Sequence, residues 1–63
     1  MSEIEELKKN EMVIGYNYWV DNELLGLVKI MDGLFIFHKK TGNSEIRYDL
    51  SEKQLEIYNV RLA

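Results

Sequence analysis

The chain has 63 residues, no cysteine, one histidine and a net charge of −3. A domain of this size buries only about 60% of the surface that its unfolded chain exposes, so its stability is marginal without a disulfide, a metal or a partner chain. The absence of cysteine excludes disulfides and thiolate metal sites, and a single histidine argues against structural zinc. Oligomerisation remains as the expected source of extra stability, while the acidic charge argues against general attraction to nucleic acid or anionic membranes.

The composition, with 46% hydrophobic and 30% charged residues, is typical of a folded globular protein. No apolar run approaches the ~20 residues that a membrane-spanning helix needs, and the charged start SEIEELKK is unlike a signal peptide. We therefore expect residues 1–63 to form one domain of a cytoplasmic protein that makes no membrane contact.

The first residues carry the pattern of a short helix. Ser2 followed by Glu5 matches a capping box, and acidic residues come early and lysines late, as the helix dipole favours. Ile4 and Leu7 supply a narrow apolar stripe. A helix this short persists only when it packs on something.

Three turn signals then recur along the chain: Asp21-Asn22, Asp32-Gly33 and Gly42-Asn43. Gly, Asn and Asp accept the positive φ of tight hairpins, and regular spacing of such turns between apolar runs is typical of consecutive antiparallel strands. The sequence predicts strands over residues 12–20, 23–31, 34–41 and 44–50. The alternative is a helix over residues 22–32, but Gly26 in its middle would cost about 1 kcal/mol relative to alanine, and the β-branched Val28 and Ile30 favour a strand.

The C-terminal segment begins with a second capping box, Ser51 with Gln54, which predicts a helix. Beyond it the apolar residues fit helical spacing, but Tyr58, Val60 and Leu62 also alternate as they would in a strand. Both a helix and a strand therefore fit residues 55–62. The predicted fold class is α+β: a short N-terminal helix, a four-stranded antiparallel β-meander in the order 1-2-3-4, and a C-terminal helix.

Tight turns fix the register of the hairpins and so predict the two faces of the sheet. The face expected to be core, under the C-terminal segment, carries Val13, Trp19, Leu24, Val28, Ile30, Phe35, Phe37, Ile46, Tyr48 and Leu50. The other face is also largely apolar, and left in water it would exceed the few hundred Å² that soluble monomers usually expose. We therefore expect a homodimer, or else a complex with another protein, whose interface contains Tyr16, Tyr18, Leu25, Leu27, Met31, Leu34 and Ile36.

Two glycines, Gly15 and Gly26, fall inside the predicted strands. A glycine within a strand usually marks a bulge, a bend or a close approach of two backbones. We expect the sheet to curl there, with a ligand bound at the gap as the alternative.

Candidate catalytic groups are few. The one imidazole, His38, is predicted to face Arg47 with Glu45 and Asp49 beside it, which is typical of a cross-strand charge cluster on the surface. The sequence has no cysteine nucleophile, no phosphate-binding glycine loop and no cluster of metal ligands. We therefore expect no catalytic residue, no cofactor and no metal.

The sequence thus favours a small non-enzymatic protein–protein interaction or regulatory module. One alternative is a sheet that binds single-stranded nucleic acid, stacking bases on Tyr16 and Tyr18 beside His38, Lys40 and Arg47. The other is a monomeric accessory protein of bacterial or phage type, in which the two helices cover both faces.

Overall fold

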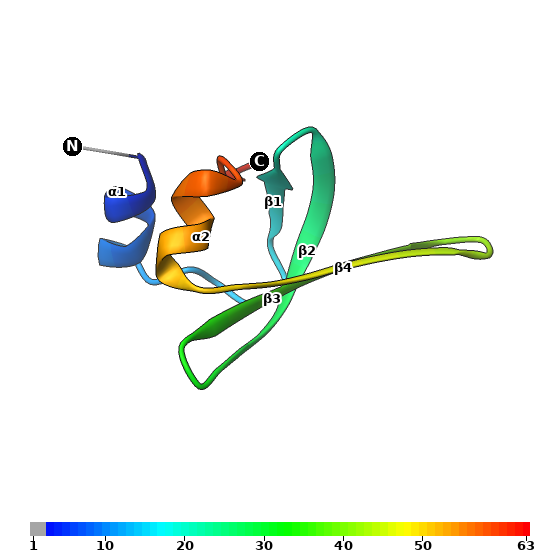
Figure 1. The fold of residues 1–63 in the computed structure, drawn as a ribbon, viewed down its shortest axis with the longest axis horizontal. Coiled ribbons are helices and arrows are strands. Elements are labelled where there is room, and N and C mark those ends of the chain that lie inside the picture. Colours follow the sequence, from blue (N-terminus) through cyan, green and yellow to red (C-terminus); the bar gives the residue numbers. More distant parts are fainter. Residues whose placement is uncertain (1–2) are drawn as a thin grey trace.

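Two short helices pack against one side of a curved antiparallel sheet (Figure 1). The structure, a computed structural model, describes residues 3–63. Its elements are α1 (Glu3–Lys9), β1 (Asn17–Val20), β2 (Glu23–Met31), β3 (Leu34–Thr41), β4 (Ser44–Leu50), α2 (Glu52–Ile57) and β5 (Arg61–Leu62). The strand order is β4-β3-β2-β1-β5, and all neighbours are antiparallel. The predicted α+β fold and the 1-2-3-4 meander are confirmed, and a short fifth strand is added beside β1.

The turn residues place β2, β3 and β4 within the bounds that the sequence predicts. Asp32 and Gly33 both have positive φ, 53° and 76°, as a type I′ turn requires, and Gly42 has φ 58° at the first position of the β3–β4 turn. The alternative helix over residues 22–32 is therefore wrong, because this segment pairs with strands on both sides.

The first strand is shorter than predicted, because residues 11–16 form a loop. Gly15 has φ 94°, a conformation that other residues rarely adopt, and the chain leaves the extended state there. The loop is nevertheless tied to the sheet: the Gly15 N–H donates to the Leu27 carbonyl at 2.7 Å, and the Leu27 N–H donates to the Tyr16 carbonyl at 3.0 Å.

The C-terminal segment contains both of the predicted alternatives. The capping box is formed, with the Gln54 N–H donating to Ser51 Oγ at 3.4 Å and the Ser51 N–H donating to Gln54 Oε1 at 3.0 Å. The helix ends at Ile57, Asn59 turns the chain with φ 50°, and β5 then pairs with β1. Ser2, the predicted cap of the N-terminal helix, lies outside the described residues.

The core lies between the helices and the sheet face turned toward them, which we call the inner face; the opposite face is the outer face. The buried core residues are Ile4, Met12, Tyr18, Val20, Leu25, Leu27, Phe37, Leu50, Leu55 and Val60. The rings of Tyr18 and Phe37 meet edge to face, with centroids 5.8 Å apart and an interplanar angle of 74°. The buried Tyr18 hydroxyl accepts a hydrogen bond from the Val13 N–H at 2.9 Å, which also holds the loop.

A β-bulge at Val28 decides which residues of β2 face the core. On one side of it Leu27 pairs with Phe37, and on the other Lys29 pairs with Ile36, so Val28 is an extra residue without a partner on β3. Because side chains alternate along a strand, one extra residue exchanges the two faces from that point on. All three hairpins have the tight two-residue turns that the sequence predicts, because Val20 pairs with Glu23, Met31 with Leu34, and Thr41 with Ser44.

The bulge overturns the predicted face assignment for β1 and for the part of β2 that precedes it. Phe37 and Leu50 are buried on the inner face as predicted, and Phe35, Ile46 and Tyr48 pack partly against them. Three residues that were expected in the core are instead 36–49% exposed: Trp19, Leu24 and Val28. Beyond the bulge the predicted face is right, and before it the two faces are reversed.

Candidate functional site

The residues predicted to form one interface are distributed over three places. Tyr18, Leu25 and Leu27 are buried within the single chain beneath the helices, so their assignment to an exposed face is wrong. Met31, Leu34 and Ile36 lie on the outer face, as the alternation with Phe35 and Phe37 requires. Tyr16 lies in the loop and is exposed. The structure therefore does not bring the seven residues together on one surface.

A cleft lies between α1, the loop that follows it and the β2–β3 hairpin. It has a volume of ≈ 390 Å³ and is lined by Lys8, Glu11, Met12, Ile30, Phe35 and Glu52. Three of the lining residues are apolar, and Ile30 is 40% exposed, so the apolar floor is open to solvent. The rim is charged: the ammonium of Lys8 lies 3.2 Å from a carboxylate oxygen of Glu52.

The third charged residue of this rim is Glu11. Its carboxylate forms no ion pair with any residue that the structure describes. Glu11 follows α1 and has φ 56°, and its N–H donates to the Lys8 carbonyl at 3.1 Å. The chain therefore places a free carboxylate beside an apolar floor, which favours a ligand that carries a positive charge next to an apolar group.

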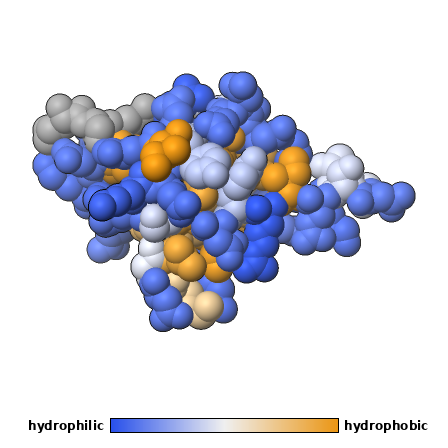
Figure 2. All heavy atoms as spheres, in the orientation of Figure 1, coloured by the Kyte–Doolittle hydropathy of each residue, from blue (hydrophilic) through white to orange (hydrophobic). Residues whose placement is uncertain are grey.

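Further large apolar side chains are exposed on the loop and the hairpin that contribute to the cleft. In the loop, Val13, Ile14 and Tyr16 are 46–58% exposed, and on the hairpin Met31 is 46% exposed. Apolar atoms are visible over the β2–β3 hairpin at the bottom of Figure 2. Single exposed apolar residues are ordinary on a protein surface, but three in one short loop that also contributes Glu11 and Met12 to a cleft are typical of a binding site.

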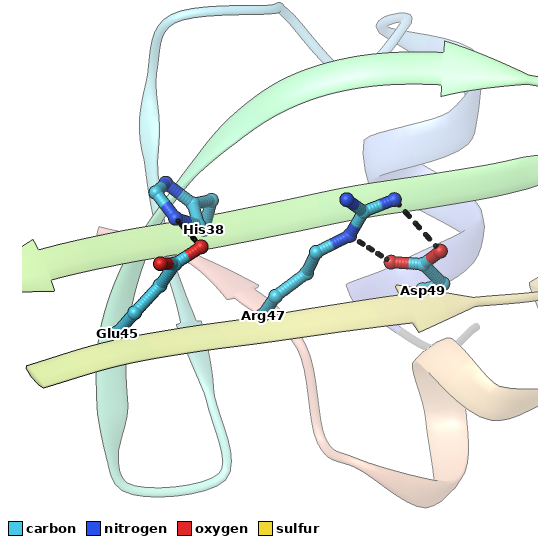
Figure 3. A network of polar contacts seen from close by, with 4 residues as sticks. All are labelled: His38, Glu45, Arg47 and Asp49. Atoms are coloured by element: carbon cyan, nitrogen blue, oxygen red, sulfur yellow. Dashed lines mark hydrogen bonds and ion pairs between the residues drawn. The ribbon is translucent and has the colours of Figure 1, made fainter.

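A second cluster lies on the outer face of the β3–β4 hairpin (Figure 3). His38 Nε2 lies 2.9 Å from Glu45 Oε1, and Arg47 binds Asp49 through two hydrogen bonds of 2.8 and 3.2 Å. The hydrogen bond and the positive charge of Arg47 lower the pKa of the Asp49 carboxyl, and Asp49 in turn raises the pKa of the guanidinium. This is the cross-strand charge cluster that the sequence predicts.

The predicted nucleic-acid platform is not assembled. Base stacking needs exposed aromatic rings beside free cations, but Tyr18 is buried in the core and Arg47 is engaged by Asp49. Tyr16 is exposed, yet it belongs to the loop rather than to the outer face that carries His38 and Arg47.

Within residues 3–63, no group of His, Asp and Glu is arranged to hold a metal ion, and no helix of that part of the chain is both long and apolar enough to cross a membrane. No family model, no curated protein and no solved structure matches this chain.

The cleft was not predicted from the sequence. Its residues come from α1, the loop, β2, β3 and α2, and only the packing of the helices brings them together. One signal was present: Gly15, placed after the apolar pair Val13 and Ile14, marks the point where the chain departs from the sheet.

Proposed function

We propose that this chain is a non-enzymatic protein-interaction module, and that its cleft binds an apolar side chain of another protein with a basic residue next to it. The observation that carries the proposal is the apolar floor of Met12, Ile30 and Phe35 beside the free carboxylate of Glu11. A volume of ≈ 390 Å³ lies within the range of about 300–1,000 Å³ typical of ligand pockets.

The loop beside the cleft supports this function because it is held in place before any partner arrives. Backbone hydrogen bonds tie Gly15 and Tyr16 to Leu27, and the Tyr18 hydroxyl holds the Val13 N–H. A surface that is already ordered loses less conformational entropy on binding than a mobile one. Exposed Ile14 and Tyr16 can therefore extend the contact around the anchor residue.

The test is a titration of ¹⁵N-labelled protein with three blocked tetrapeptides, Gly-Leu-Lys-Gly, Gly-Leu-Glu-Gly and Gly-Ala-Lys-Gly, followed by NMR. We expect the Leu-Lys peptide to shift the amide signals of Met12, Ile30 and Phe35, and each of the other two to bind more weakly because one half of the recognition is missing. Glu11→Gln should weaken binding of the Leu-Lys peptide roughly three-fold, as expected for an exposed charge pair. Glu23→Gln, at the far end of β2, is the control and should leave binding unchanged.

Three outcomes would overturn the proposal. Equal shifts with all three peptides, or no shift at millimolar peptide, would show that the cleft does not recognise this chemistry. If the same signals move with protein concentration alone, the occupant of the cleft is a second copy of the chain and not another protein.

A further inference from the structure

The strand β4 forms an open edge of the sheet. It pairs with β3 residue for residue from Ser44 to Leu50 without a bulge, and no other strand of residues 3–63 lies beside it. Figure 1 shows the β3–β4 hairpin extending from the rest of the molecule as an arm. Proteins usually protect such an edge by a very short strand, a proline or a bulge. β4 has seven residues and neither a proline nor a bulge, so its protection consists of the charged side chains of Glu45, Arg47 and Asp49.

The backbone groups at this edge follow from the turn. Thr41 and Ser44 close a two-residue turn, so they form the first hydrogen-bonded pair, and such pairs then alternate along the hairpin. The even-numbered residues of β4 therefore bond to β3. The N–H and C=O groups of Glu45, Arg47 and Asp49 point away from β3 and are available to another strand.

The charges at the edge are complementary to those of a second β4, provided that the register is shifted. Along the outer face the order is Glu45, Arg47, Asp49, that is, negative, positive, negative. An antiparallel copy with Arg47 opposite Arg47 would oppose like charges at every position. A shift of two residues instead sets Glu45 of each chain opposite Arg47 of the other, and opposite charges in such cross-strand pairs are stabilising.

We propose that two copies of this chain join through antiparallel pairing of their β4 strands, with a two-fold axis at Ile46. Within each copy, Glu45 contacts His38 through Oε1, so its Oε2 is available to the other copy. Arg47 donates to Asp49 from Nε and Nη2, so its Nη1 is also available. These remaining atoms supply two ion pairs across the axis. On the inner face, the half-buried Ile46 side chains of the two copies meet at the axis.

The alternatives at the sheet edges are weaker. A register with Arg47 opposite Asp49 also pairs opposite charges, but its axis falls at Tyr48 and brings the second chain toward α2, which begins at Glu52. The other edge strand, β5, has two residues. Pairing about Ile46 uses the projecting part of the arm, so the helices and the cleft of each copy stay clear of the junction. The proposed dimer would thus present two clefts.

The test is sedimentation equilibrium over a range of protein concentrations. We expect the wild-type mass to rise toward twice 7.5 kDa. Arg47→Glu and Glu45→Arg should each raise the dissociation constant about tenfold or more, because each opposes like charges twice across the axis. The double variant, Glu45→Arg with Arg47→Glu, should restore dimerisation, since it reverses both members of each pair. Circular dichroism of the variants checks that the fold is kept.

A monomer mass at millimolar wild-type protein would overturn the proposal. So would an equal dissociation constant for the wild type and both single variants, since the junction would then lie elsewhere. If Ile30→Asp splits the dimer and the charge variants do not, the junction is at the cleft. Peptide binding in the cleft is measured separately and does not depend on this result.

Discussion

Phe37→Ala should remove a large share of the free energy of unfolding of this chain. Phe37 is fully buried, and its ring meets Tyr18 edge to face at the centre of the core. Truncating a buried phenylalanine costs about 3–5 kcal/mol. A domain of 63 residues has a free energy of unfolding of roughly 3–9 kcal/mol, taking about 0.05–0.15 kcal/mol per residue. The loss therefore removes a large share of the stability, and the measurement is urea unfolding followed by circular dichroism.

The matched control is Tyr16→Ala, which also removes an aromatic ring. Tyr16 is 58% exposed and lies in the loop, so its truncation should change the free energy of unfolding by about 0.5 kcal/mol or less. If Phe37→Ala unfolds at the same urea concentration as the wild type, Phe37 does not lie in the core.

Leu27→Ala should destabilise the chain far more than Val28→Ala. Leu27 is fully buried opposite Phe37, whereas Val28 is the extra residue of the bulge and is 49% exposed. Removing a buried leucine side chain costs about 2–5 kcal/mol, and a surface substitution about 0.5 kcal/mol. The free energies of unfolding of the two variants, from urea titrations, test the bulge directly. A larger loss for Val28→Ala would mean that β2 runs without a bulge and that Val28 faces Phe37.

The elements that the sequence predicts well are those set by local chemistry. Hairpin turns need residues that accept positive φ, and Asp32-Gly33 and Gly42-Asn43 supply them, so the bounds of β2, β3 and β4 follow. The capping box of Ser51 and Gln54 likewise places the start of α2. Each of these signals acts within a few residues of its position.

The features that sequence reasoning missed depend on contacts between distant segments. The bulge has no turn residue of its own; Gly26, two positions before Val28, was the one local hint that β2 is irregular. The first strand was extended too far because Val13 and Ile14 look like strand residues, although Gly15 takes the chain away from the sheet. The first error assigned apolar residues to the wrong face, and the second concealed the loop whose residues Glu11 and Met12 line the cleft.

The cleft includes the loop that carries Glu11 and Met12, and the Tyr18 hydroxyl holds this loop, so the proposed binding site requires Tyr18, and not Trp19, to face the helices. One fluorescence measurement decides which of the two does. Trp19 is the single tryptophan of the chain and stands on the outer face with 37% of its surface exposed. Two strands separate β1 from β4, so a dimer joined at β4 would leave Trp19 accessible. We expect its emission in the folded protein to be quenched readily by acrylamide. Blue-shifted emission that acrylamide does not quench would place Trp19 in the core and would contradict the arrangement of faces on which the cleft depends.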